Sequence, residues 1–110
     1  MRINVLGTHY TIEEKQRALD KDLENANGYC DNTTKEIVIA ARDNGCNLGN
    51  YEVYRKKVLR HEIIHAFLFE SGLHENFQHQ EYGHEETMVD WIAVQYPKIK
   101  KAFEAAGCCD

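Results

Sequence analysis

The sequence contains no apolar run approaching the roughly 20 residues that a membrane-spanning helix requires. Residues 1–7 are too short a stretch and too polar to act as a signal peptide. None of the four cysteines forms a CxxC pair, so free thiols are expected rather than a disulfide or zinc framework. These absences predict a cytoplasmic protein that does not contact membranes.

An excess of positive charge is also absent. The chain has 13 Lys and Arg residues against 18 Asp and Glu residues, which gives a net charge of −5. Nucleic-acid binding depends on clustered Lys and Arg, so no nucleic-acid partner is expected. The length of 110 residues and a hydrophobic share of 43% predict one globular domain over residues 1–110. The oligomeric state stays open.

The first half of the chain shows the patterns of a small sheet. Residues 2–10 predict a strand with a bulge at Gly7, and a Thr-x-x-Glu capping signature predicts a helix over residues 12–25. Residues 29–41 predict a hairpin, in which residues 37–41 are apolar on both alternating faces. Such a strand is expected to be covered on both sides.

The second half predicts helices. Asn50 is a suitable N-cap for a helix that ends near residues 71–72. His61 and His65 lie on an otherwise apolar stripe of this helix, and a second apolar stripe predicts that the helix is central and buried. After a polar loop, another helix is expected to begin near residue 84 or 85. Pro97 should interrupt it, before a last helix over residues 98–106.

The central helix contains the sequence His61-Glu62-Ile63-Ile64-His65, an HExxH motif. Residues four apart on a helix lie one above the other, so both imidazoles can bind one metal ion. Bound zinc lowers the pKa of a water ligand towards about 7. Glu62 can then act as the general base and pass the proton to a leaving amine. The opposing interpretation is a pair of core histidines with backbone partners.

A catalytic zinc site needs a third protein ligand. Glu86 and Asp90 share one helix face, so a ligand at Glu86 places Asp90 where it can accept the second ring N–H of His61. Glu85 is the alternative third ligand, and both glutamates could instead be favourable charges in a first helical turn. The other downstream candidates are His74, His79, Glu81 and His84.

On these residues the chain resembles the zincin metallopeptidases. It is most similar to the gluzincins in their smallest form, the minigluzincins, and to small HExxH proteins encoded by phages and mobile elements. One part of the resemblance is the HExxH motif, and the other is residues 86–90, which match the gluzincin ExxxD pattern. The metzincin continuation is absent, because Ser71 stands where its third histidine would be. The resemblance covers residues 29–96.

The resemblance implies a minimal zincin-like α+β domain, with a sheet of about three strands packed on the HExxH helix and a metal-ligand helix after it. It implies one zinc ion per chain, held by His61, His65 and Glu86, with Glu62 as the general base and Asp90 as the outer carboxylate. It also implies hydrolysis of a peptide or protein substrate that binds as an extended strand along a sheet edge. Substitutes for the family's oxyanion-stabilising His or Tyr are Tyr82, His79 and His84.

The alternative function is a zinc-binding but non-catalytic module, such as a phage accessory or regulatory protein that binds a protein partner. A closed site with four protein ligands, including His84 or His79, would favour this structural role. A fourth position open to water would favour hydrolysis.

Overall fold

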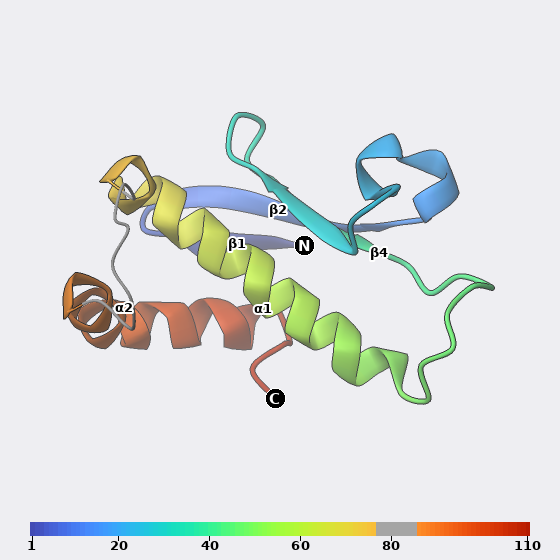
Figure 1. The fold of residues 1–110 in the computed structure, drawn as a ribbon. Coiled ribbons are helices and arrows are strands. Elements are labelled where there is room, and N and C mark those ends of the chain that lie inside the picture. Colours follow the sequence, from blue (N-terminus) through green and yellow to red (C-terminus); the bar gives the residue numbers. More distant parts are fainter. Residues whose placement is uncertain (77–85) are drawn as a thin grey trace.

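The computed structural model describes residues 1–76 and 86–110, with the backbone alone at positions 75, 76, 86, 87, 89, 90 and 93. One mixed sheet has the strand order β1-β2-β4-β3, and two long helices pack on one of its faces (Figure 1). The elements are β1 (Arg2–Val5), β2 (Thr8–Lys15), β3 (Gly28–Asp31), β4 (Glu36–Ala40), α1 (Tyr51–Glu70) and α2 (Glu86–Ala105). The fold is α+β as predicted, with four strands rather than three.

The first two strands form an antiparallel hairpin with a two-residue turn. Leu6 and Gly7 have φ angles of 52° and 97°, and the Gly7 N–H donates to the Asn4 side chain at 2.7 Å. Positive φ at both positions is typical of a type I′ turn, whose twist matches that of the strands. The prediction of a single strand with a bulge at Gly7 is therefore wrong, because the chain reverses direction there.

The predicted helix over residues 12–25 does not form. The second strand continues to Lys15 and pairs in parallel with β4. Two short 3-10 helices follow, η1 (Arg17–Leu19) and η2 (Lys21–Leu23), in which Leu23 is buried but Leu19 is 81% exposed. The apolar residues thus form no continuous helical face, and pairing with β4 outweighs the local capping signature.

The hairpin predicted over residues 29–41 is confirmed, since β3 and β4 pair antiparallel. The odd-numbered apolar residues of β4 join the core beneath the helices. Its even-numbered residues pack on the other face with Leu23 of η2. The prediction that this strand is covered on both sides is therefore also confirmed.

The helix α1 has the limits that its sequence predicts. The Asn50 side chain accepts a hydrogen bond from the Val53 N–H at 3.2 Å, and Gly72 follows the helix with a φ of 79°. The prediction that this helix is central and buried holds only for one of its two apolar stripes, because His61 and His65 on the other stripe are exposed. The second stripe is the buried one, and the buried residues of α1 are Leu59, Glu62, Ile63, Ala66 and Phe67.

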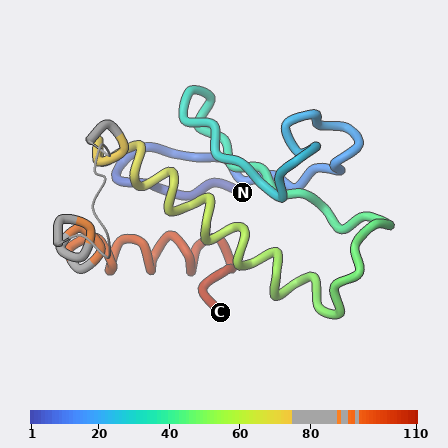
Figure 2. The backbone as a smooth tube through the Cα atoms, in the orientation of Figure 1, coloured from blue at the N-terminus to red at the C-terminus, as the bar shows by residue number. Residues whose placement is uncertain are grey.

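The helix α2 continues through Pro97, so the predicted interruption is wrong. A proline inside a helix removes one backbone hydrogen bond. Beyond Pro97, however, Ile99 and Ala102 are each 4% exposed and belong to the core shared with β1 and α1. Burial of this face keeps the segment helical, and Figure 2 shows the red C-terminal part of α2 running back beside α1. Neither described helix is both long and apolar enough to cross a lipid bilayer.

The C-terminal end of α1 is tied to the sheet through Glu70. Its carboxylate accepts hydrogen bonds from the hydroxyls of Thr8 and Tyr10 at 3.2 and 2.8 Å, and from Lys35 Nζ at 2.6 Å. Burial raises the pKa of Glu70, but these three hydrogen bonds outweigh it and hold the pKa below its ordinary value. The end of α1 is therefore fixed against β2 and the turn before β4.

Candidate metal centre

The HExxH residues form a compact donor group in the middle of α1. The Nε2 atoms of His61 and His65 are 3.1 Å apart, and the group's possible ligand atoms, including a Glu62 oxygen, lie within 4.8 Å of one another. Two nitrogens bound to tetrahedral zinc at about 2.0–2.1 Å would be about 3.3 Å apart. The spacing of the two rings thus suits a shared ion. Within residues 1–76 and 86–110, no other such group could hold a metal ion.

Glu62 differs from the two histidines in burial. The residue is 7% exposed, and none of the described residues donates a hydrogen bond to its carboxylate. Burial raises the pKa of Glu62, and the positive charge of His61 opposes this rise only in part. A carboxylate with a raised pKa and no fixed donor is a stronger base than an ordinary carboxylate, which suits it to accept and return a proton.

The surroundings of His65 favour its neutral form. Partial burial of the ring lowers its pKa, and the positive charges of His61 and then His74 lower it further. Neutral imidazole is the form that binds metal ions. His74 itself lies in η3 (Leu73–Asn76), with its ring centroid 4.4 Å from that of Phe69. The structure therefore places His74 beside the site, outside the donor group.

The edge strand β3 packs tightly against α1 next to this site. A Cβ atom at Gly28 would lie 2.9 Å from Val58 Cγ1 and 3.0 Å from the Val38 carbonyl oxygen, so only glycine fits without a shift. Burial, followed by the negative charge of Glu62, raises the pKa of Cys30 to about 12. The Cys30 thiol is therefore protonated at neutral pH, and all four cysteines are free.

The donor group opens on a cavity of about 310 Å³ between α1 and the chain that enters β3. Its lining includes Asn27, Gly28, Tyr54, Lys57, His61 and Glu62. No role at the site was predicted for the first four of these residues. A helical spacing of four and seven residues before His61 was the available signal for Lys57 and Tyr54. No local signal existed for Asn27 and Gly28, which reach the site through the packing of β3.

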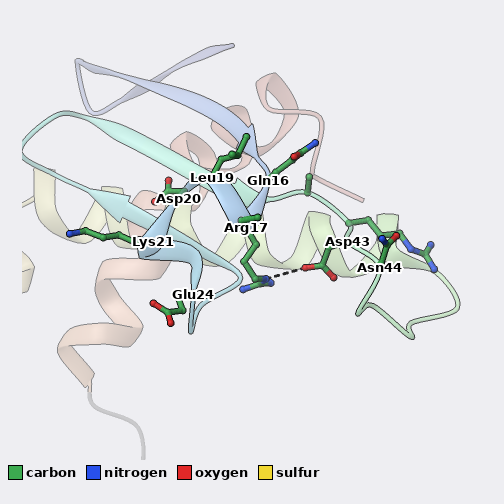
Figure 3. A pocket seen from close by; sticks show the side chains of 11 residues that line it. Gln16, Arg17, Leu19, Asp20, Lys21, Glu24, Asp43 and Asn44 are labelled. Carbon is green, nitrogen blue, oxygen red and sulfur yellow. Dashed lines mark hydrogen bonds and ion pairs between the residues drawn. The ribbon is translucent and has the colours of Figure 1, made fainter.

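A larger cavity of about 940 Å³ lies elsewhere, between the 3-10 helices and the chain that follows β4 (Figure 3). Arg17 points across it to Asp43, and their Nε and Oδ2 atoms are 3.2 Å apart. The same guanidinium donates to the carbonyl oxygen of Ala26 at 2.7 Å. Arg17 thus acts as a structural link, and no residue that lines this cavity belongs to the metal-donor group.

The remaining predicted site residues lie at or beyond the limits of the described residues. Glu86 is the first residue of α2 and Asp90 follows one turn later, but their side chains lie outside the described part. The other predicted residues of the site lie in residues 77–85, outside the described residues: His79, Glu81, Tyr82, His84 and Glu85. The third ligand and the oxyanion stabilisers therefore stay predictions.

No protein-family model, curated protein or solved structure matches the chain. The case for a function therefore rests on the chemistry of these residues.

Proposed function

We propose that this chain is a zinc-dependent metallopeptidase with Glu62 as its general base. One observation carries the proposal: two imidazole nitrogens lie 3.1 Å apart beside a buried carboxylate that lacks a hydrogen-bond donor among the described residues. The adjoining cavity of about 310 Å³ supports it, because a catalytic centre needs space for substrate.

The donor set fits zinc. Two imidazoles and one carboxylate are a known ligand set of catalytic zinc. His61 and His65 would supply the nitrogens, and Glu86 at the start of α2 is the proposed third ligand, with Glu85 as the alternative. Asp90 would accept the second ring N–H of His61 and so fix its tautomer. When bound, zinc supplies Lewis acidity, which polarises a substrate carbonyl and acidifies water.

The residues of the chain then have distinct tasks in peptide hydrolysis. Glu62 takes the proton of the attacking water and returns it to the leaving amine nitrogen. Its raised pKa suits both steps, since the carboxyl must be deprotonated first and protonated afterwards. As an edge strand, β3 offers backbone groups along which an extended peptide can align above α1.

Metal analysis tests the centre directly. We expect purified protein dialysed against zinc to hold one ion per chain, and His65→Ala to lose it. His74→Ala is the matched control, because this neighbouring histidine lies outside the donor group. Zinc retained at full affinity by His65→Ala would overturn the metal centre. Loss of zinc in Glu85→Ala but not in Glu86→Ala would move the third ligand by one residue.

Activity is tested with a peptide library derived from a whole proteome. Zinc-loaded wild-type protein should cleave library peptides, and zinc-loaded Glu62→Gln should not. If zinc is bound but nothing is cleaved, X-ray absorption at the zinc edge distinguishes the alternative. Four protein ligands and no water would then favour the alternative, a structural and non-catalytic zinc module.

A further inference from the structure

The cavity beside the metal-donor group contains a lysine without an ion-pair partner. Lys57 precedes His61 by four residues, which is about one helical turn, and it lines the same cavity. Its side chain is exposed, and none of the residues in the described ranges forms an ion pair with it. Glu52, which lies five residues before Lys57 on α1, is engaged with Arg55 at 2.8 Å. The Lys57 ammonium group is therefore available to a ligand.

The hydroxyl of Tyr54 is a second donor that lines the same cavity. The Asn27 amide is oriented by Arg17, whose Nη2 donates to Asn27 Oδ1 at 2.8 Å. Asn27 Nδ2 in turn donates to the Tyr54 hydroxyl oxygen at 2.6 Å. The Tyr54 oxygen thus acts as an acceptor towards Asn27, which leaves its own proton free for another acceptor.

Among the described residues that line this cavity, Glu62 is the only acidic one, and the proposed function assigns it to proton transfer. An ammonium and a phenolic O–H in a shared cavity suit an anionic oxygen ligand, because charge-assisted hydrogen bonds are the stronger ones. A carboxylate is the anionic group that a peptide carries.

We propose that this cavity is a subsite for a substrate carboxylate, with Lys57 as the residue that determines specificity and Tyr54 as the second donor. The inference rests on the proposed metallopeptidase function and adds the substrate class, which is peptides with a negative charge next to the cleaved bond. The carboxylate comes either from an acidic side chain or from a free C-terminus.

Calorimetric titration of the zinc-loaded protein with hydroxamates tests the subsite without requiring turnover. The first pair of probes is N-acetylglutamic α-hydroxamate and its glutamine counterpart, which differ only in the side-chain charge. A second pair carries a succinyl hydroxamate on alanine, with either a free carboxylate or an amide at the C-terminus. The pair that shows the preference identifies the source of the carboxylate.

We expect the carboxylate probe of one pair to bind about fivefold more tightly than its neutral partner, which corresponds to about 1 kcal/mol. The preference should vanish in Lys57→Met and reverse towards the neutral probe in Lys57→Glu. Lys56→Met is the matched control, because it removes the same charge from the adjacent residue, which does not line the cavity. This control should keep the preference.

The outcomes separate the two proposals. If the charged and the neutral hydroxamate of each pair bind with equal affinity, the carboxylate subsite is wrong and the metal centre stands. A preference that survives Lys57→Met would also overturn the subsite. If no hydroxamate binds to protein that holds zinc, no open metal position exists, and both proposals are wrong.

Discussion

Two glutamates on α1 have opposite environments. Glu62 and Glu70 are eight residues apart, which is about 12 Å along the helix axis. Both are shielded from solvent, since residue Glu62 is 7% exposed and the Glu70 side chain is 14% exposed. Yet the pKa of Glu62 is raised, chiefly by burial, whereas hydrogen bonds outweigh burial and lower the pKa of Glu70.

The difference comes from the donors that each carboxylate meets. Glu70 accepts three hydrogen bonds, from Thr8, Tyr10 and Lys35, which stabilise its charged form. None of the described residues donates to Glu62, so burial dominates there. A carboxylate with three protein donors is suited to hold a fold together, whereas one without a protein donor beside two histidines is suited to proton transfer.

The largest expected effect is on catalysis. Glu62→Gln should lower the rate of cleavage of any library substrate by about 10²–10⁴-fold, the range of general acid–base catalysis. Its zinc content should stay at the wild-type value, because Glu62 is not a proposed ligand. Glu70→Gln removes the same charge two turns away and should cleave within a few-fold of wild type. Equal losses in both variants would contradict the division between a catalytic and a structural carboxylate.

The order of effects should reverse for stability. Glu70→Gln should lower the free energy of unfolding by about 2 kcal/mol, because hydrogen bonds to a charged group are lost. In urea titrations of the metal-free protein this appears as a lower midpoint at an unchanged slope. Glu62→Gln should change stability by no more than about 0.5 kcal/mol or raise it slightly, since it removes a buried charge that has no donor. A larger loss in Glu62→Gln would show that its carboxylate is structural.

The stabilising effect of Glu70 should depend on pH. Its pKa is lower in the folded protein than in the unfolded chain, where it is about 4.3. Above that value both states are deprotonated, and the full stabilisation is present. As the pH falls, the unfolded chain takes up the proton first, so the stabilisation is lost by the time the pH passes the folded-state pKa. The difference in unfolding free energy between wild type and Glu70→Gln should be constant above about pH 6 and shrink below about pH 4.3. A difference that grows on acidification would contradict the direction of the shift.

The sequence predicts those parts of the fold that are governed by local signals. The Asn50 cap and Gly72 define α1, and the two-faced apolar stretch of β4 is confirmed as a strand covered on both sides. The segment 12–15 was predicted wrongly because its partner is β4, more than 20 residues further along the chain. Parallel pairing of this kind leaves no local trace. At Pro97 a local helix-breaking signal is overridden by burial of Ile99 and its neighbours.

The features of the candidate site likewise divide into those that local spacing predicts and those that depend on packing. The proximity of His61, Glu62 and His65 follows from the helix period alone, so spacing predicts it. The burial of Glu62 and the exposure of the histidines depend on which face of α1 meets the sheet, and two apolar stripes left that choice ambiguous. Asn27 reaches the cavity only because Gly28 lets β3 approach α1 closely.

The smallest expected effect is on stability and comes from Lys35, one of the three donors to Glu70. Lys35 Nζ lies 2.6 Å from Glu70 Oε1, but the lysine side chain is 40% exposed, so solvent screens the pair. Lys35→Met should lower the unfolding free energy by about 0.5–1 kcal/mol, less than Glu70→Gln, because the hydroxyls of Thr8 and Tyr10 remain. Residue 35 has a backbone φ of 58°. Lysine and methionine are equally affected by this angle, so Lys35→Met tests the charge alone.

Added salt tests whether the effect of Lys35→Met on stability is electrostatic. At about 1 M NaCl the Debye length falls to about 3 Å, and the difference between wild type and Lys35→Met should shrink. Lys101→Met, an exposed lysine of α2 without an ion pair in the described part of the chain, is the control and should be neutral. A Lys35→Met loss equal to that of Glu70→Gln would mean that the ammonium alone holds the carboxylate. Glu70 would then be a simple ion pair, and its contrast with Glu62 would come from one charge rather than from three donors.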